Sequence, residues 1–181
     1  MKKLSKILIL VLSLAIICGA LAVVVSADAA DGYDLTASLT NATADESGTK
    51  TVKLTGNATL ENTYTVKENL TIDLNGYTFT SRLDTAFLVN ENVTFSIVGN
   101  GNIVLDGILV KSSEVESSPV IKLGSEDGFI NINHNGGTNM RIVSTHTGKY
   151  EFVNLKVVSD ATVSGAKYNA LFETVYNTEA R

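Results

Sequence analysis

The feature that most constrains the fold is a short segment that occurs twice, 23 residues apart. Residues 69–76 read Asn-Leu-Thr-Ile-Asp-Leu-Asn-Gly, and residues 92–99 read Asn-Val-Thr-Phe-Ser-Ile-Val-Gly. Residues 129–132 and 152–155 match one another at the same spacing. A period of this length indicates stacked structural repeats. Two longer apolar columns keep it: Leu74, Ile97, Val120, Val143 and Ala166, and Ala86, Leu109, Ile132 and Leu155.

The repeat predicts a β-solenoid with about 23 residues per coil. A coil of that length holds about three short strands with their turns, and each strand would pair with its counterpart roughly 4.8 Å away in the next coil. Because alternate residues of a strand point to opposite faces, we expect Leu70, Ile72 and Leu74 to face the interior. Thr71 and Asp73 should then face solvent. One coil cannot bury its apolar face, whereas a stack can.

The composition of the chain beyond its N-terminus favours an all-β fold. The sequence has one proline and no tryptophan. After residue 30 it is rich in Thr and Val, which favour strands, and in Asn and Gly, which favour turns. No long stretch there has apolar residues at helical spacing. The same short strands would also fit a β-sandwich adhesin domain, which hairpins would favour and stacked parallel strands would exclude.

The N-terminus has the pattern of a secretory signal peptide. Lysines precede an uncharged apolar run over residues 7–25, and small residues follow it. We therefore predict a signal peptide over residues 1–29, which also forms an N-terminal apolar helix. The alternative is an uncleaved anchor that holds the protein in the membrane through residues 7–25. Either way the body is exported, to the cell surface or beyond, and a short lysine-rich signal suggests a bacterial source.

The distribution of polar and strand-forming residues predicts the domain organisation. Residues 30–50 are polar and are expected to form a linker, and residues 51–181 the β-helix domain. That domain would be incomplete at its C-terminus, since no capping helix precedes Arg181. Cys18, the only cysteine, lies in the apolar run, so disulfides are not expected to hold the body together.

The charge of the exported body limits its partners. Cleavage would leave 11 basic and 18 acidic residues, a net charge of −7. Nucleic acid is therefore not an expected partner, because phosphate binding needs positive charge. A polysaccharide or a cell-surface glycan is compatible with this charge.

One segment resembles a known superfamily. Residues 64–80, Tyr-Thr-Val-Lys-Glu-Asn-Leu-Thr-Ile-Asp-Leu-Asn-Gly-Tyr-Thr-Phe-Thr, are similar to the opening coils of right-handed parallel β-helix proteins of the pectate-lyase-like superfamily, and residues 150–157 resemble a later coil. The resemblance covers roughly residues 50–175 and implies a right-handed parallel β-helix. It implies little about activity, because the superfamily includes polysaccharide lyases, glycoside hydrolases, adhesins and other surface proteins.

The sequence offers no catalytic constellation, so no catalytic, metal or cofactor site is predicted. Glycoside hydrolysis needs a pair of carboxylates, and none can be assembled around Asp73, whose expected counterpart is Ser96. The acidic pair Glu126-Asp127 is interpreted as a turn between strands and not as calcium ligands. His134 and His146 lack the acidic or cysteine partners of a metal site, so we interpret them as surface-loop residues. Several asparagines are candidates for sugar ligands, but we interpret them as satisfying backbone groups at the corners of the coils. They are Asn131, Asn133, Asn135, Asn139 and Asn154.

Two functions remain open. The first is a non-enzymatic surface module with a structural, adhesive or glycan-contacting role. The second is the N-terminal part of a carbohydrate-active enzyme, a polysaccharide lyase or glycoside hydrolase, whose catalytic coils lie beyond Arg181.

Overall fold

The computed structural model describes residues 32–113, 118–135, 141–145 and 148–159, together with the backbone of 172–174. The predicted signal peptide with its apolar run and Cys18 lies outside these residues. So do His146, Asn139 and Ala166. In the part of the chain that is described, no helix is long and apolar enough to cross a membrane.

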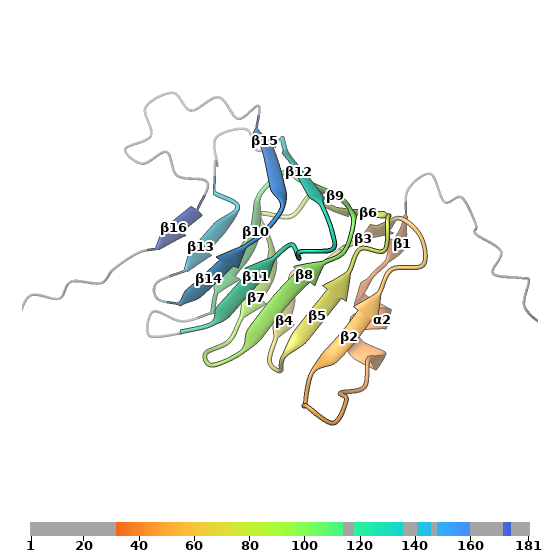
Figure 1. The fold of residues 1–181 in the computed structure, drawn as a ribbon, viewed down its shortest axis with the longest axis vertical. Helices are drawn as coiled ribbons and strands as arrows, with labels where there is room; N and C mark the ends of the chain where they lie inside the picture. Colours follow the sequence, from red (N-terminus) through yellow and green to blue (C-terminus); the bar gives the residue numbers. More distant parts are fainter. Residues whose placement is uncertain (1–31, 114–117, 136–140, 146–147, 160–171, 175–181) are drawn as a thin grey trace, which may run out of the picture.

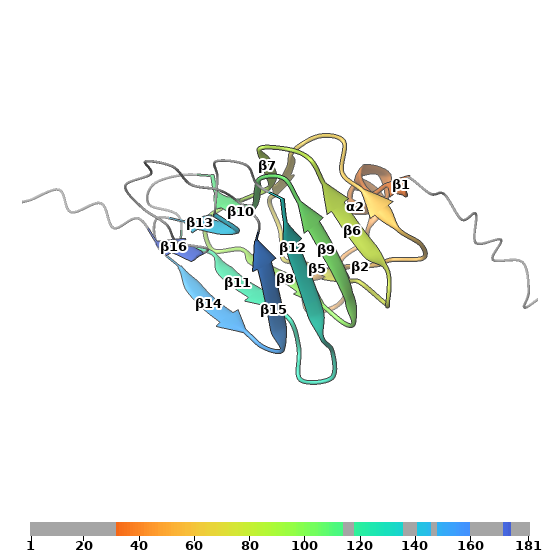
Figure 2. The same ribbon diagram turned by 90° about the horizontal axis from the view of Figure 1, so that it is seen from above.

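The chain winds repeatedly through three sheets in the order A, C, B (Figure 1, Figure 2). Sheet A contains β1 (Tyr33–Asp34), β3 (Ala58–Thr59), β6 (Thr78–Ser81), β9 (Gly101–Leu105), β12 (Ile130–His134) and β15 (Leu155–Ser159). Sheet B contains β2 (Lys50–Lys53), β5 (Leu70–Asp73), β8 (Thr94–Val98), β11 (Val120–Leu123) and β14 (Lys149–Phe152). Sheet C contains β4 (Tyr64–Val66), β7 (Thr85–Val89), β10 (Ile108–Ser112), β13 (Val143–Thr145) and β16 (Phe172–Thr174).

Neighbouring strands in all three sheets are parallel, and each pairs with the strand of the next coil. This arrangement confirms the predicted all-β parallel solenoid with about three strands per coil. It excludes the β-sandwich, whose hairpins would pair strands antiparallel. Parallel strands need a long connection between them and a buried face. In this fold the rest of each coil is the connection, and the interior of the stack buries the face.

The core is a column of apolar side chains inside the three sheets. Leu70, Ile72 and Leu74 are at most 3% exposed, as their alternation predicts. In one coil a phenylalanine from each sheet meets in the interior. The ring centroid of Phe87 lies 5.6 Å from that of Phe79 and 4.8 Å from that of Phe95. Tilted aromatic contacts at these distances are favourable.

The strict 23-residue register is wrong in sheets A and B. Leu70 pairs with Phe95, 25 residues later, and not with residue 93. A shift of two residues keeps each side chain on the same face of the strand. The two segments therefore show the same apolar–polar alternation, although their equivalent residues are not paired. The apolar residues that recur every 23 positions therefore do not stack on one another, since Ile97 lies opposite Ile72 and not opposite Leu74.

Coil length varies because the corners differ. Sheet C does keep the 23-residue spacing, with Thr65 opposite Leu88. From Val110 to Val143, however, the coil is longer. Strand pairing and burial set the register, and the corners between strands absorb the extra residues.

The described part of residues 30–50 differs from the expected linker. β1 pairs with β3, and the short helix α2 (Thr36–Asn41) follows it. Leu35 and Leu39 are fully buried, and the Tyr64 hydroxyl donates a hydrogen bond to the Leu39 carbonyl at 3.2 Å. Lying between β1 of sheet A and β2 of sheet B, α2 takes the place that a sheet C strand holds in later coils. It therefore caps the N-terminal end of the solenoid, which a stack of coils requires.

Of the asparagines expected to satisfy backbone groups at coil corners, Asn154 does so, whereas the Asn131 side chain contacts the side chain of Asn102. The Asn154 side-chain amide donates to the carbonyls of Ser125 and Glu126 at 3.0 and 3.2 Å. Its backbone has φ 51°, a left-handed conformation that asparagine tolerates. The sequence had not singled out three further examples, in which the side-chain oxygens of Asn57, Asn69 and Asn100 accept hydrogen bonds from the backbone of a neighbouring coil.

Candidate functional site

The outward side of sheet A presents a ladder of mostly uncharged polar side chains, which begins at Asp34, is interrupted by Val104 and ends at Lys156 and Val158. The strand register places Thr78, Asn102 and Asn131 in one row across β6, β9 and β12. Alternate residues of these strands, such as Phe79 and Ile132, are buried in the core. We call this surface the amide–hydroxyl face; it consists of Thr59, Thr78, Thr80, Asn102, Asn131 and Asn133.

Contacts between coils order the face. The Asn131 side-chain nitrogen lies 3.4 Å from the Asn102 side-chain oxygen, which links two coils. Amides and hydroxyls can each donate and accept hydrogen bonds. A regular surface of such groups can therefore bind a ligand that is itself rich in hydroxyls.

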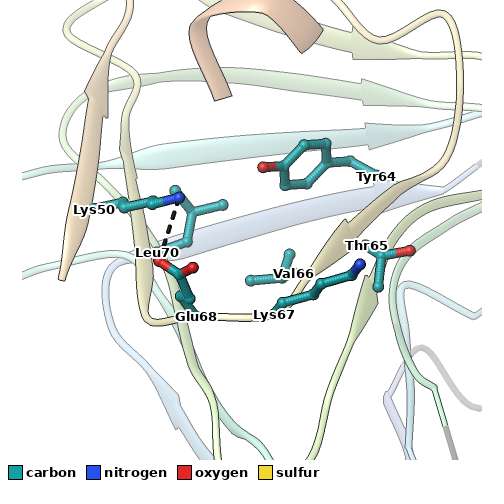
Figure 3. Close-up of a pocket in the computed structure, with 7 residues that line it drawn as sticks. All are labelled: Lys50, Tyr64, Thr65, Val66, Lys67, Glu68 and Leu70. Carbon is teal, nitrogen blue, oxygen red and sulfur yellow. Dashed lines mark ion pairs between the residues drawn. The ribbon is translucent and has the colours of Figure 1, made fainter. Parts of the chain in front are cut away.

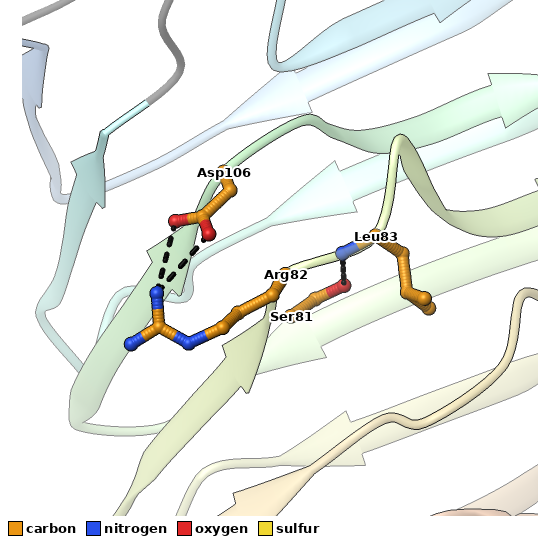
Figure 4. A network of polar contacts seen from close by, with 4 residues as sticks. All are labelled: Ser81, Arg82, Leu83 and Asp106. Atoms are coloured by element: carbon orange, nitrogen blue, oxygen red, sulfur yellow. Dashed lines mark hydrogen bonds and ion pairs between the residues drawn. The ribbon is translucent and has the colours of Figure 1, made fainter.

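A charged edge borders this face where the sheet A strands end. Glu61, Arg82 and Asp106 each follow a residue of one aligned row, Thr59, Thr80 and Val104, by two positions. The Arg82 guanidinium forms an ion pair with the Asp106 carboxylate at 3.1 Å (Figure 4). Both side chains are partly exposed, so the pair contributes little to stability and its charges remain accessible.

A hollow of about 270 Å³ lies between the face and the charged edge. It lies beside sheet A at the ends of β3 and β6. Its lining combines hydroxyl, charged and apolar groups: Thr59, Leu60, Glu61, Thr80, Arg82 and Leu83. The hollow is partly open to solvent.

A second, smaller hollow of about 110 Å³ lies at the N-terminal end, beside α2 (Figure 3). Its apolar lining, Val66 and Leu70, belongs to the core. At its rim the Lys50 amine and the Glu68 carboxylate form an ion pair at 3.2 Å. The hollow is therefore an open, incompletely filled end of the core with an ion pair at its rim.

The acidic residues considered from sequence stay apart. Glu126 and Asp127 are exposed in a turn between β11 and β12, as interpreted. Asp73 faces outward, but its counterpart is Val98 and not Ser96, and it forms an ion pair with Lys53 at 3.7 Å. The described residues contain no group of three histidines, cysteines or acids that could hold a metal ion.

His134 is not a surface-loop residue. It occupies an inward position at the end of β12 and is 1% exposed. Its Nδ1 atom lies 3.0 Å from the Ser159 hydroxyl of β15. The alternation of β12, with Ile130 and Ile132 also buried, explains the burial, and His134 therefore links two coils inside the stack.

Sequence reasoning missed the charged edge. Its members are 21 and 24 residues apart, so a constant period does not align them. Charged residues one or two positions after the ends of β3, β6 and β9 would have been the signal. That signal becomes visible only when the strand ends are known.

Comparisons with known proteins assign the chain to no family. No protein-family model matches it. No curated protein and no solved structure matches it significantly either. The functional argument therefore depends on the residues of this chain and on their arrangement.

Proposed function

We propose that this protein is an exported surface module whose amide–hydroxyl face contacts a glycan. The observation that carries the proposal is the group of threonine and asparagine side chains that the outward ladder presents on β3, β6, β9 and β12, with the hollow at its edge. Sugars offer many hydroxyls, and these amides and hydroxyls can pair with them as donors and as acceptors. A rigid stack presents the ladder at the strand spacing of about 4.8 Å, so little ordering would be needed on binding.

The wider setting of the proposal is extracellular. The signal-peptide pattern over residues 1–29 supports export, by cleavage or by anchoring through residues 7–25. Membership of the pectate-lyase-like superfamily, with its right-handed coil, belongs to the same proposal and rests on the resemblance of residues 64–80. The surface role would be structural, adhesive or glycan-contacting.

Affinity electrophoresis against a panel of soluble polysaccharides tests the glycan contact. We expect at least one polysaccharide to retard the protein. Asn133→Trp should abolish the retardation, because Asn133 is an exposed residue on the face. Thr51→Trp is the matched control, since Thr51 is an exposed strand residue on sheet B. Equal retardation of both variants would contradict the proposed face.

A second candidate function is carbohydrate cleavage. Glu61 and Asp106 lie two coils apart on the charged edge, so the strand spacing separates their backbones by roughly 9.6 Å. Inverting glycosidases hold their carboxylates about 6.5–9.5 Å apart. Release of reducing ends from a retained polysaccharide, lost in Glu61→Gln, would favour the enzyme over the binding module. Release of unsaturated ends would favour a lyase.

A further inference from the structure

We infer that the hollow at the charged edge selects a sugar that carries a free amino group, with the Glu61 carboxylate as its counter-ion. The inference rests on the proposed glycan contact and names the class of sugar. It follows from how the three charges of the edge are distributed.

Arg82 is the only basic residue among those that line the hollow. Its guanidinium is already engaged, because Asp106 accepts from it with both carboxylate oxygens, at 3.1 and 3.5 Å. A sugar carboxylate would therefore be attracted less strongly to Arg82, because Asp106 already offsets its positive charge. It would also approach the carboxylate of Glu61, which repels it.

Glu61 is exposed and forms no ion pair within the described residues. One of its oxygens accepts a weak hydrogen bond from the Thr59 hydroxyl at 3.4 Å, which turns the carboxylate toward the amide–hydroxyl face. The charged edge thus carries one negative charge in excess. An ammonium group bound there gains a charge-assisted hydrogen bond.

The size of the hollow fits one sugar unit. Its 270 Å³ is slightly below the range of about 300–1,000 Å³ for pockets that enclose drug-sized ligands. Hydroxyls of the same sugar, or of the next unit, can reach Thr59 and Thr80 in its wall. The ammonium supplies selectivity, and the hydroxyl contacts supply the remaining affinity.

The test compares three oligosaccharides of equal length, built from glucosamine, glucose or galacturonate, by calorimetry with the exported chain. At low salt we expect the glucosamine oligomer to bind about tenfold more tightly than the glucose oligomer, and the galacturonate oligomer most weakly. Added salt should reduce the difference, because exposed charges are screened.

Glu61→Gln should lower glucosamine affinity to that of the glucose oligomer measured with the same variant. Glu91→Gln is the matched control, because Glu91 is an exposed acid in the turn between β7 and β8, away from sheet A. It should keep the preference, which separates Glu61 from the general negative charge of the protein.

Two results would overturn the inference: a preference that persists in Glu61→Gln, or galacturonate that binds as tightly as glucosamine. If all three oligomers bind equally and Asn133→Trp abolishes their binding, the glycan contact stands and the selectivity fails. If none of the oligomers binds and no polysaccharide retards the protein, the proposed function fails as well.

Discussion

Single residues decide how well each coil is filled. Phe87 of sheet C touches both Phe79 of sheet A and Phe95 of sheet B, so one ring joins all three walls of the coil. Phe87 is fully buried. Its removal would leave a cavity that the parallel ladders cannot collapse around, because their spacing is fixed by backbone hydrogen bonds.

We predict that Phe87→Ala lowers the free energy of unfolding by about 3–5 kcal/mol, measured by urea denaturation. Leu88→Ala is the matched control, since Leu88 is the next residue of the same strand and is only partly buried. It should cost less than about 1.5 kcal/mol. Similar losses in both variants would mean that the aromatic contact does not fill the coil as described.

At the scale of elements, the start of α2 is held by Asp34, two positions before its first residue. The Asp34 carboxylate accepts hydrogen bonds from the Thr36 backbone N–H at 3.0 Å and from the Thr36 hydroxyl at 2.7 Å. These bonds favour the ionised carboxylate and hold the pKa of Asp34 below its ordinary value of 3.8. A lowered pKa in the folded state stabilises the fold above the unfolded pKa, and the contribution is lost as pH falls through the folded pKa.

We therefore predict that Asp34→Ala lowers the urea midpoint at neutral pH and that the difference from wild type shrinks as the pH falls below 3.8 and through the lowered pKa of Asp34. Asp127→Ala is the control, because Asp127 is exposed in the turn after β11. It should leave the midpoint unchanged at neutral and at acid pH. A difference for Asp34→Ala that persists in acid would show that its hydrogen bonds do not depend on the ionised form.

Elements were predictable from sequence where alternation alone decides them. Leu70, Ile72 and Leu74 are buried as expected, because the period of two in a strand is local information. The helix α2 was missed because six residues give little helical signal. Its only trace was Leu35 and Leu39, four positions apart.

The candidate site was less predictable than the strands. Glu61, Arg82 and Asp106 lie in different coils, and corners of unequal length separate them. A constant period therefore places them in different rows. Their proximity follows from strand pairing, which depends on the whole stack and not on any one segment.

At the scale of the whole molecule, the solenoid is a one-dimensional stack. Each strand pairs with the strand of the coil before and the coil after it. α2 closes one end by packing Leu39 against the first complete coil. In such a stack, the free energy of unfolding is the sum of the stabilities of the coils and of the interfaces between neighbouring coils. A substitution in one coil should therefore destabilise mainly that coil and its neighbours.

Hydrogen exchange measured by mass spectrometry tests this. We predict that Leu39→Ala, which removes packing from the cap, accelerates exchange in β1 to β4 and leaves β9 to β12 protected. Phe87→Ala should instead accelerate exchange in β6 to β8 and in the coils on either side. The two patterns differ because local unfolding starts at the substituted coil. Each further coil that unfolds requires another interface between coils to be broken, which costs additional free energy. Uniform acceleration of all three sheets in both variants would contradict the stack and indicate one cooperative unit, in which the cap stabilises distant coils as strongly as its neighbour.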